Sequence, residues 1–472
     1  MATKKDLVEA YSFSRRRLVT AFVSGAPGGR EVEPPRPGRT VVGGLALAVL
    51  LVAGAGVAHL LSPATAADWT QPGLVSEKET GADYVILEEP AEGEPAELRP
   101  VANITSAMLL LGADVEPTVV PAEEIDGEVR GDRIGILQAP ATPPSPDLLV
   151  PTGWTSCTGT AADGSPLGIR TRVADDPQVA AVPDRGVVVR SDDRTWLLAE
   201  TDGVTADDPR TARAYPVPED AQTSLLSQLV GATDPVAVPP DWLALFPTGG
   251  ALRLDTLGVS EDEIGSRPAA AALRDAGLRV GDVVGDGAGY VVRADDVLEL
   301  DDFSRQVYDL VAPEHDERPD TAVPDVDAVA VAATDPDVAW PTGPVSALDD
   351  PQVCALLDTA PDRAPATLLA LPDGPESSAE EVPEGVTDPM VETGHGAVVD
   401  SGDFSGEGAA TPTLVDDRAR AYGLDEQSRD LLGYADVPRV VVPQPWLLLL
   451  PSDVALTQDA ARCPPDVRSS SC

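Results

Sequence analysis

The sequence has little of what catalysis or nucleic-acid binding requires. Its 472 residues include only 3 His, which leaves few candidate general bases. Lysine occurs only at positions 4, 5 and 78, and no Gly-Lys pair exists, so the phosphate-binding loop of P-loop ATPases is missing. Acidic residues outnumber basic ones 79 to 33, which gives a formal net charge of −46. This charge excludes nucleic acid as an expected partner, because phosphate recognition needs a basic surface.

Aromatic residues and cysteines are also scarce. Aromatics make up 4% of the chain while hydrophobic residues make up 43%, so we expect a core built mostly of Val, Leu and Ala. The 47 Pro and 41 Gly favour many short elements over long helices. The 4 Cys stand at positions 157, 354, 463 and 472 without a Cys-x-x-Cys motif, which disfavours a zinc ribbon or a redox dithiol. Spacing alone leaves three pairings open.

One long apolar run, Val41 to Leu61, predicts a transmembrane helix. Its 21 residues would span roughly 30 Å, the thickness of a hydrocarbon core. Arginines precede the run and acidic residues follow it, so the positive-inside rule predicts a cytoplasmic N-terminus and a large extracytoplasmic part. A cleaved signal peptide is the alternative, but the run is longer than a usual signal core.

The predicted membrane-proximal contacts lie on two segments. An amphipathic helix is expected over residues 6–23, where Arg15, Arg16 and Arg17 would meet anionic lipid or an acidic partner. In the membrane run, small residues would let another helix approach closely, unless they are generic apolar filling. These small residues are Gly43, Gly44, Gly54 and Gly56.

After residue 68 a degenerate repeat recurs four times; its ideal form has short β-branched strands and a Val-Pro corner, and the third copy, near residues 289–313, is weaker. The second and fourth copies share a Trp-Leu-x-Leu-x-Pro pattern, so Trp242 and Trp446 are expected to anchor their repeats. The Asp-Asp-Pro-Gln-Val sequence also occurs twice, from Asp175 and from Asp349. It indicates a central domain made of two halves, or else two unrelated turns.

Other chemical signals are weak. The glycine-rich stretch 281–289 leads into a strand rather than a helix, which favours a hairpin turn. His395 has Asp400 and Ser401 nearby but no nucleophile elbow, so a hydrolytic role is disfavoured. Paired aspartates, such as Asp325 and Asp327, lack the pattern of a calcium loop. We therefore expect no catalytic, cofactor-binding or metal-binding residues.

The motifs together resemble the EccB family, a membrane component of the type VII (ESX) secretion system. They include DLVEAYSFSRRRLVTAFVSG, SEKETGADYVIL, ELRPVANITSAMLLLG, TGWTSC, DDPQVCAL and VPQPWLLLLPSDVALTQDAA, which follow one another along nearly the whole chain. The resemblance implies an α+β fold with a single N-terminal transmembrane helix. It also implies an elongated extracytoplasmic region of four small repeat domains around a two-part central domain. The segments expected are the cytoplasmic helix and linker 1–40, transmembrane helix 41–61, repeats 68–137, 193–253, 254–315 and 396–461, central parts 138–192 and 316–395, and tail 462–472.

The resemblance implies a structural subunit of an inner-membrane secretion complex that assembles with EccC, EccD and EccE, near the mycosin protease, and self-associates. It further implies a Cys157–Cys354 disulfide; Cys463 and Cys472 either pair with each other or stay free. Family members carry an association with ATP hydrolysis, yet no Walker motif is present, so enzymatic function and an ATP cofactor are disfavoured. The alternative function is a membrane-anchored module that binds cell wall.

Overall fold

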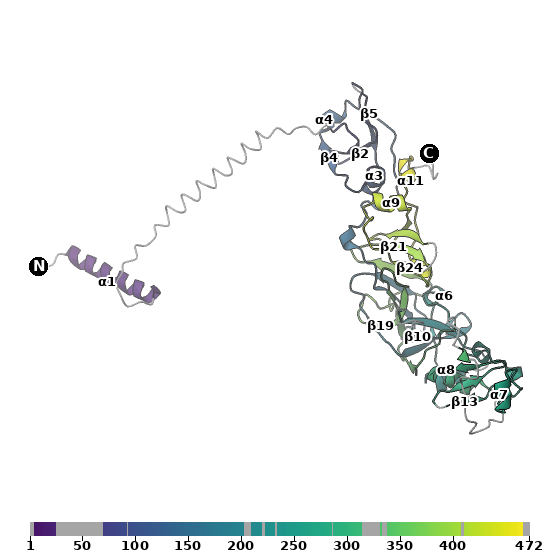
Figure 1. Cartoon of the computed structure of the whole chain (residues 1–472). Coiled ribbons are helices and arrows are strands. Elements are labelled where there is room, and N and C mark those ends of the chain that lie inside the picture. The colour runs from purple at the N-terminus through teal and green to yellow at the C-terminus, as the bar shows by residue number, and fades with distance from the viewer. Residues whose placement is uncertain are drawn as a thin grey trace. The chain divides into compact units, whose positions relative to one another are not determined.

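A computed structural model of the chain is shown in Figure 1. It describes residues 4–24, 69–91, 93–202, 209–219, 222–231, 234–285, 287–313, 331–332, 338–406 and 410–465. The chain divides into two compact units, Met1–Asp68 and Trp69–Cys472. The predicted membrane run Val41 to Leu61, with Gly43, Gly44, Gly54 and Gly56, lies outside the described residues. Of the helices that the structure does describe, none has the length and apolar character needed to cross a membrane.

The first unit contributes one described helix, α1 (Lys4–Ser24), which includes the helix predicted over residues 6–23. Arg15, Arg16 and Arg17 lie on it and are exposed. Apolar side chains of the same helix are exposed as well, among them Leu7 (67%) and Tyr11 (73%). This unit therefore presents both the apolar and the cationic side chains that the sequence predicts for a contact surface.

The second unit combines several small sheets with short helices, as expected for an α+β chain. Its first sheet has the order β4-β1-β2-β3-β5, and β4 lies parallel to β1. The elements are β1 (Gly73–Glu77), β2 (Asp83–Ile86), β3 (Glu97–Pro100), α3 (Ile104–Leu111), β4 (Pro117–Val120), α4 (Ala122–Ile125) and β5 (Val129–Arg130). Helix α3 begins where the Asn103 side chain accepts a hydrogen bond from the Ser106 backbone N–H.

Two later sheets have the same topology. One has the order β11-β10-β9-β12 and contains β9 (Arg185–Ser191), β10 (Arg194–Thr201), β11 (Thr211–Pro216), α5 (Gln222–Leu229), β12 (Val236–Ala237) and α6 (Pro240–Leu243); β17 (Ser346–Ala347) also pairs with β9. The other has the order β23-β22-β21-β24 and contains β21 (Ala397–Gly402), β22 (Thr411–Val415), β23 (Ala421–Gly423), α9 (Glu426–Leu431), β24 (Val441–Pro443) and α10 (Gln444–Leu448).

In all three sheets, three antiparallel strands are followed by a helix and by a strand that lies parallel beside the first. A proline then begins a short helix. Pro121, Pro239 and Pro443 each take this position with an extended backbone, so proline ends the strand and fixes the direction of the next turn.

A further sheet departs from this topology. It has the order β13-β14-β15-β16, and its last strand lies parallel to the third rather than to the first. Its elements are η2 (Leu254–Leu257), η3 (Glu261–Glu263), α7 (Ala271–Asp275), β13 (Val283–Val284), β14 (Tyr290–Val292), β15 (Val297–Glu299), α8 (Asp302–Val311) and β16 (Val331–Ala332). The glycine-rich stretch joins β13 to β14, the antiparallel hairpin that the sequence predicts.

The largest sheet has six strands in the order β20-β7-β6-β18-β19-β8. They are β6 (Trp154–Gly159), β7 (Ile169–Val173), β8 (Val179–Ala181), β18 (Gln352–Asp358), β19 (Ala366–Pro372) and β20 (Thr387–Val391). Hairpins β6-β7 and β18-β19 meet at the antiparallel β6-β18 pair. The third strand of each half crosses over: β8 pairs with β19, and β20 pairs with β7. This sheet is called the central sheet below.

The strands do not follow all predicted segment limits. Strand β9 lies within the range expected for the first central part but pairs with β10 of the neighbouring sheet. Strand β16 lies within the range expected for the second central part but pairs with β15. The remaining elements are η1 (Pro146–Leu148) and α11 (Gln458–Arg462), which packs near α3.

Candidate functional site

The first tryptophan corner is formed by helix α6 and the residues that follow it. Trp242 has no exposed surface, and its indole Nε1 donates a hydrogen bond to the Ser156 carbonyl oxygen on β6 at 2.9 Å. Its ring meets Phe246 edge to face, with ring centroids 5.1 Å apart. The corner therefore attaches the β9-β12 sheet to the central sheet through both apolar contact and a hydrogen bond.

The second corner, on α10, contacts the same central sheet. Trp446 is fully buried, and its Nε1 donates to the Thr367 hydroxyl on β19 at 3.4 Å. The Thr367 hydroxyl in turn donates to the carbonyl oxygen of Leu245, next to the first corner, at 2.8 Å. Trp242 and Trp446 thus belong to one hydrophobic cluster, which also contains Trp154 of the central sheet.

A disulfide joins the two halves of the central sheet. Cys157 on β6 and Cys354 on β18 lie directly opposite each other, with their Cα atoms 4.0 Å apart. Both are buried, and the bond confirms the pairing implied by the resemblance. The cysteines pack in a cluster separate from that of the tryptophan corners, because successive side chains of a strand point to opposite faces.

The two Asp-Asp-Pro-Gln-Val segments form the same local turn at different places in the sheet. The side chain of Asp176 accepts from the Gln178 backbone N–H, and that of Asp350 accepts from the Gln352 backbone N–H. The first turn precedes edge strand β8, whereas the second precedes inner strand β18.

A network of ion pairs lies at the β21-β24 sheet. Asp400 is buried and bonds Arg439 at 2.7 Å, and Arg439 also contacts Glu426 at 3.0 Å. These two carboxylates raise the pKa of Arg439 above its usual value. His395 lies 3.7 Å from Asp175, which precedes edge strand β8. Within the described ranges, no group of His, Cys, Asp and Glu could hold a metal ion.

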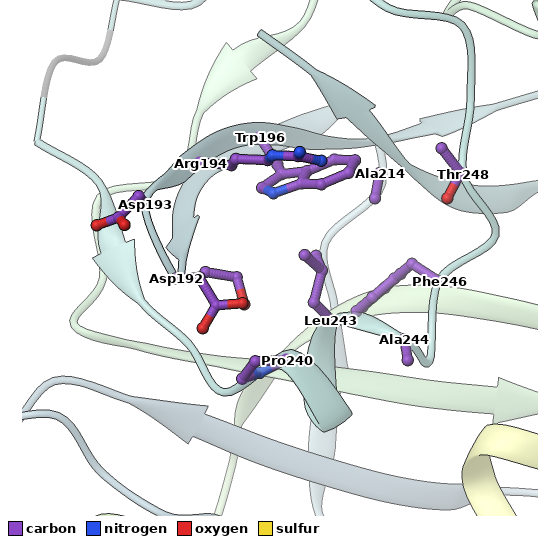
Figure 2. A pocket seen from close by; sticks show the side chains of 11 residues that line it. Asp192, Asp193, Arg194, Trp196, Ala214, Pro240, Leu243, Ala244, Phe246 and Thr248 are labelled. Atoms are coloured by element: carbon purple, nitrogen blue, oxygen red, sulfur yellow. The ribbon is translucent and has the colours of Figure 1, made fainter. Parts of the chain in front are cut away.

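A pocket of about 490 Å³ opens beside the first tryptophan corner. Its wall combines the β9-β10 turn, the inner parts of β10 and β11, and the α6 corner (Figure 2). The lining residues are Ser191, Asp192, Asp193, Arg194, Trp196, Ala214, Pro240, Leu243, Ala244, Phe246 and Thr248. Sequence reasoning missed this pocket, although the Trp-Leu-x-Leu-x-Pro pattern marks one of its walls.

The remaining predicted residues are placed as follows. Arg15, Arg16 and Arg17 lie on α1, in a different unit from the corners and the disulfide. Cys463 is buried and disulfide-bonded. Its expected partner Cys472 lies outside the described residues, so that pairing stays a prediction.

Comparison with known families identifies the family of the chain. The family model described as "Type VII secretion system ESX-1, transport TM domain B" matches residues 1–468. The chain belongs to the EccB family.

Named EccB proteins match the chain over most or about half of its length. The ESX-3 secretion system ATPase EccB3 of Mycobacterium tuberculosis (strain CDC 1551 / Oshkosh) is 26% identical over 467 residues, covering 89% of this chain and 81% of that protein. The ESX-1 secretion system ATPase EccB1 of Mycolicibacterium smegmatis (strain MKD8) is 30% identical over 238 residues, covering 48% and 47%.

Chains in solved structures of two ESX complexes share the fold. A chain of an intact ESX-5 inner membrane complex matches with a TM-score of 0.57 and 20% identity, covering 98% of this chain and 95% of that chain. A chain of the EccB3 dimer from the ESX-3 core complex matches with a TM-score of 0.59 and 22% identity, covering 83% and 100%.

Proposed function

We propose that this EccB chain is a structural subunit of a type VII secretion membrane complex. The carrying observation is the family match over residues 1–468, which includes both α1 and the sheets of the second unit. Similar chains occur in an ESX-5 inner membrane complex and in a dimer from an ESX-3 core complex. We extend this to assembly with EccC, EccD, EccE and the mycosin protease, and to self-association.

The proposed architecture has four repeat domains around a two-part central domain. Recurrence of the strand-strand-strand-helix-strand order in three sheets supports common repeats, with the β13-β16 sheet as a divergent fourth. Pairing of strands from residues 154–181 with strands from residues 352–391 supports a central domain in two parts. The repeat at β9-β12 is best begun at Arg185, because β9 is its first strand.

The proposed membrane topology is a single pass at Val41 to Leu61 with a cytoplasmic N-terminus. The arginines before this run and the acidic residues after it support that orientation. Reporter fusions test this topology. A reporter that is active only in the cytoplasm should give a signal after Gly25 and none after Pro100. A reporter that is active only outside the cytoplasm should give the reverse. Recovery of a mature chain that begins near Asp68 would instead identify a cleaved signal peptide.

Purification of the tagged full chain from detergent-solubilised membranes tests the complex. We expect the other core membrane components to co-purify in stoichiometric amounts. A chain that is recovered alone, and that is retained by purified cell wall, would favour the cell-wall-binding module.

The arginine cluster of α1 is the proposed cytoplasmic contact. The three arginines are exposed on a helix that also exposes apolar side chains, as a docking surface requires. Replacing Arg15, Arg16 and Arg17 together with Glu should release the chain from the complex, whereas the matched triple Lys variant should remain bound. The Gly25 fusion in both variants verifies that topology is unchanged; retention of the Glu variant would reduce these arginines to topology signals.

A structural rather than enzymatic role is part of the proposal. Curated relatives are named ATPases, while this sequence contains no Gly-Lys phosphate-binding motif. Equilibrium binding of labelled ATP to the purified chain distinguishes a structural role from an enzymatic one. Saturable binding, with hydrolysis lost on substitution of a residue of this chain, would overturn the structural proposal.

A further inference from the structure

The pocket beside the first tryptophan corner contains polar atoms that the fold leaves unused. Ser191 is 5% exposed, and its hydroxyl has no hydrogen-bond partner among the described residues. The indole Nε1 of Trp196 is shielded from solvent and equally unpartnered within that part of the chain. Buried donors without partners cost stability, so folding alone does not account for these two groups.

The walls of the pocket are apolar and aromatic. In Figure 2 the Trp196 indole lies across one side, with Leu243 and Phe246 opposite and Asp192 at one end. Phe246 is held by its contact with the buried Trp242, so this wall is set by the corner itself. A volume of about 490 Å³ suits one long side chain with its flanking backbone.

The rim of the pocket is acidic. Asp192 and Asp193 form the two-residue turn between β9 and β10, are exposed, and lack an ion pair in the described ranges. Asp241 is exposed on the first turn of α6, next to lining residue Pro240. Arg194 is the single cation in the lining, so carboxylates outnumber it. The chain as a whole carries a net charge of −46.

We propose that this pocket binds a basic side chain, Arg or Lys, presented with adjacent apolar residues by a segment of a partner protein. The carboxylates of Asp192 and Asp193 would pair with the cation, and the face of Trp196 would contact it. The Ser191 hydroxyl and the Trp196 N–H would donate to carbonyl groups of the segment once side-chain rotation turns them into the pocket. Charge complementarity favours a separate protein, because this chain is strongly acidic, with a net charge of −46.

Comparison of the two tryptophan corners supplies a variant that should fold and a control for it. Ala244 lines the pocket and is exposed, and Leu448, 72% exposed, is its counterpart in the second corner. Ala244→Arg would place a guanidinium in the pocket and compete with any basic ligand. Leu448→Arg adds the same charge at the equivalent position of the other corner and is the matched control.

The probe is a labelled peptide with blocked ends in which one arginine lies between two leucines. The assay measures its binding to the purified full chain in detergent. We expect saturable binding that weakens as salt rises, because exposed ion pairs are screened. Asp192→Asn with Asp193→Asn should weaken binding about tenfold. Ala244→Arg should abolish it, and Trp196→Phe should weaken it while keeping the apolar wall. Leu448→Arg and the exposed pair Glu88→Gln with Glu89→Gln should bind as the unmodified chain does.

Two outcomes overturn the inference. Equal binding of a matched peptide with glutamate in place of arginine would show that charge is not recognised. Binding of N-acetylglucosamine oligomers that Ala244→Arg blocks, without binding of the arginine peptide, would assign the pocket to carbohydrate. The assay needs no other subunit, so its failure is distinguishable from failure of the proposed complex.

Discussion

The disulfide of the central sheet offers the sharpest test of how the two halves are held together. Cys157 and Cys354 are separated by 197 residues in sequence but are direct neighbours across β6 and β18. Replacing both with Ala removes the bond without leaving a single thiol in the sheet. All variants also carry Cys463→Ala. Among the described cysteines, a reducing agent then acts only on the Cys157–Cys354 bond.

The expected loss follows from the loop that the bond closes. Chain entropy for a loop of 197 residues gives about 5 kcal/mol. Measured disulfides commonly contribute less than this model gives, so we expect a loss of about 2 to 5 kcal/mol. Urea unfolding of the full chain, monitored through a signal from the central sheet, measures this loss of stability.

The control separates the bond from ordinary packing. Val353 is fully buried on the same strand, and Val353→Ala should lower stability equally with and without reducing agent. The double cysteine variant should instead match the reduced parent and show no response to reductant. A double variant that unfolds at the same urea concentration as the oxidised parent would refute the crosslink as a main stabiliser of the sheet.

The remaining predictions concern packing and pH. Trp446→Ala should cost about 3 to 5 kcal/mol because the indole is fully buried, whereas Leu448→Ala, at a 72% exposed position, should change stability by less than about 0.5 kcal/mol; equal losses would contradict the corner geometry. Burial raises the pKa of the Glu200 carboxyl, against the opposing effects of the hydrogen bond from the Leu369 N–H and of Arg210. A raised carboxyl pKa means that the folded chain binds more protons than the unfolded one above the unfolded pKa of about 4.5, so this group lowers stability as pH rises. Glu200→Gln should therefore be more stable than the parent at pH 8, with the difference shrinking toward pH 5 in thermal unfolding; a constant difference would count against this origin.

The geometry of the repeated corners depends on local sequence. The Val-Pro pairs at or just after the ends of β4, β12 and β24 follow from proline geometry. The burial of Trp242 and Trp446 follows from their aromatic side chains. The helix near the N-terminus was likewise evident from its periodicity. The disulfide was accessible only through family resemblance, because four cysteines allow three pairings.

Features that depend on pairing between distant strands were not predictable. Strand β8 leaves its own half to pair with β19, and β9 joins the sheet that follows it, although neither departure has a local signal. The pocket was not predictable for the same reason, since residues 191–196 and 240–248 meet only through the β9-β12 pairing and the corner. Arg429 reads as a surface charge on a short helix, yet it is 4% exposed and donates to the carbonyl oxygens of Tyr434 and Val437.

The central sheet is fastened differently on its two faces. Along β18, Val353, Ala355 and Leu357 pack in the cluster of the two tryptophan corners, while Cys354 lies in the other cluster with its disulfide partner. The covalent bond fixes one half of the sheet to the other, because it crosses the β6-β18 pair. The corners fix the two flanking sheets to the same strands, because Thr367 is hydrogen-bonded to groups from both corners. A displacement of either flanking sheet must therefore disturb the shared core.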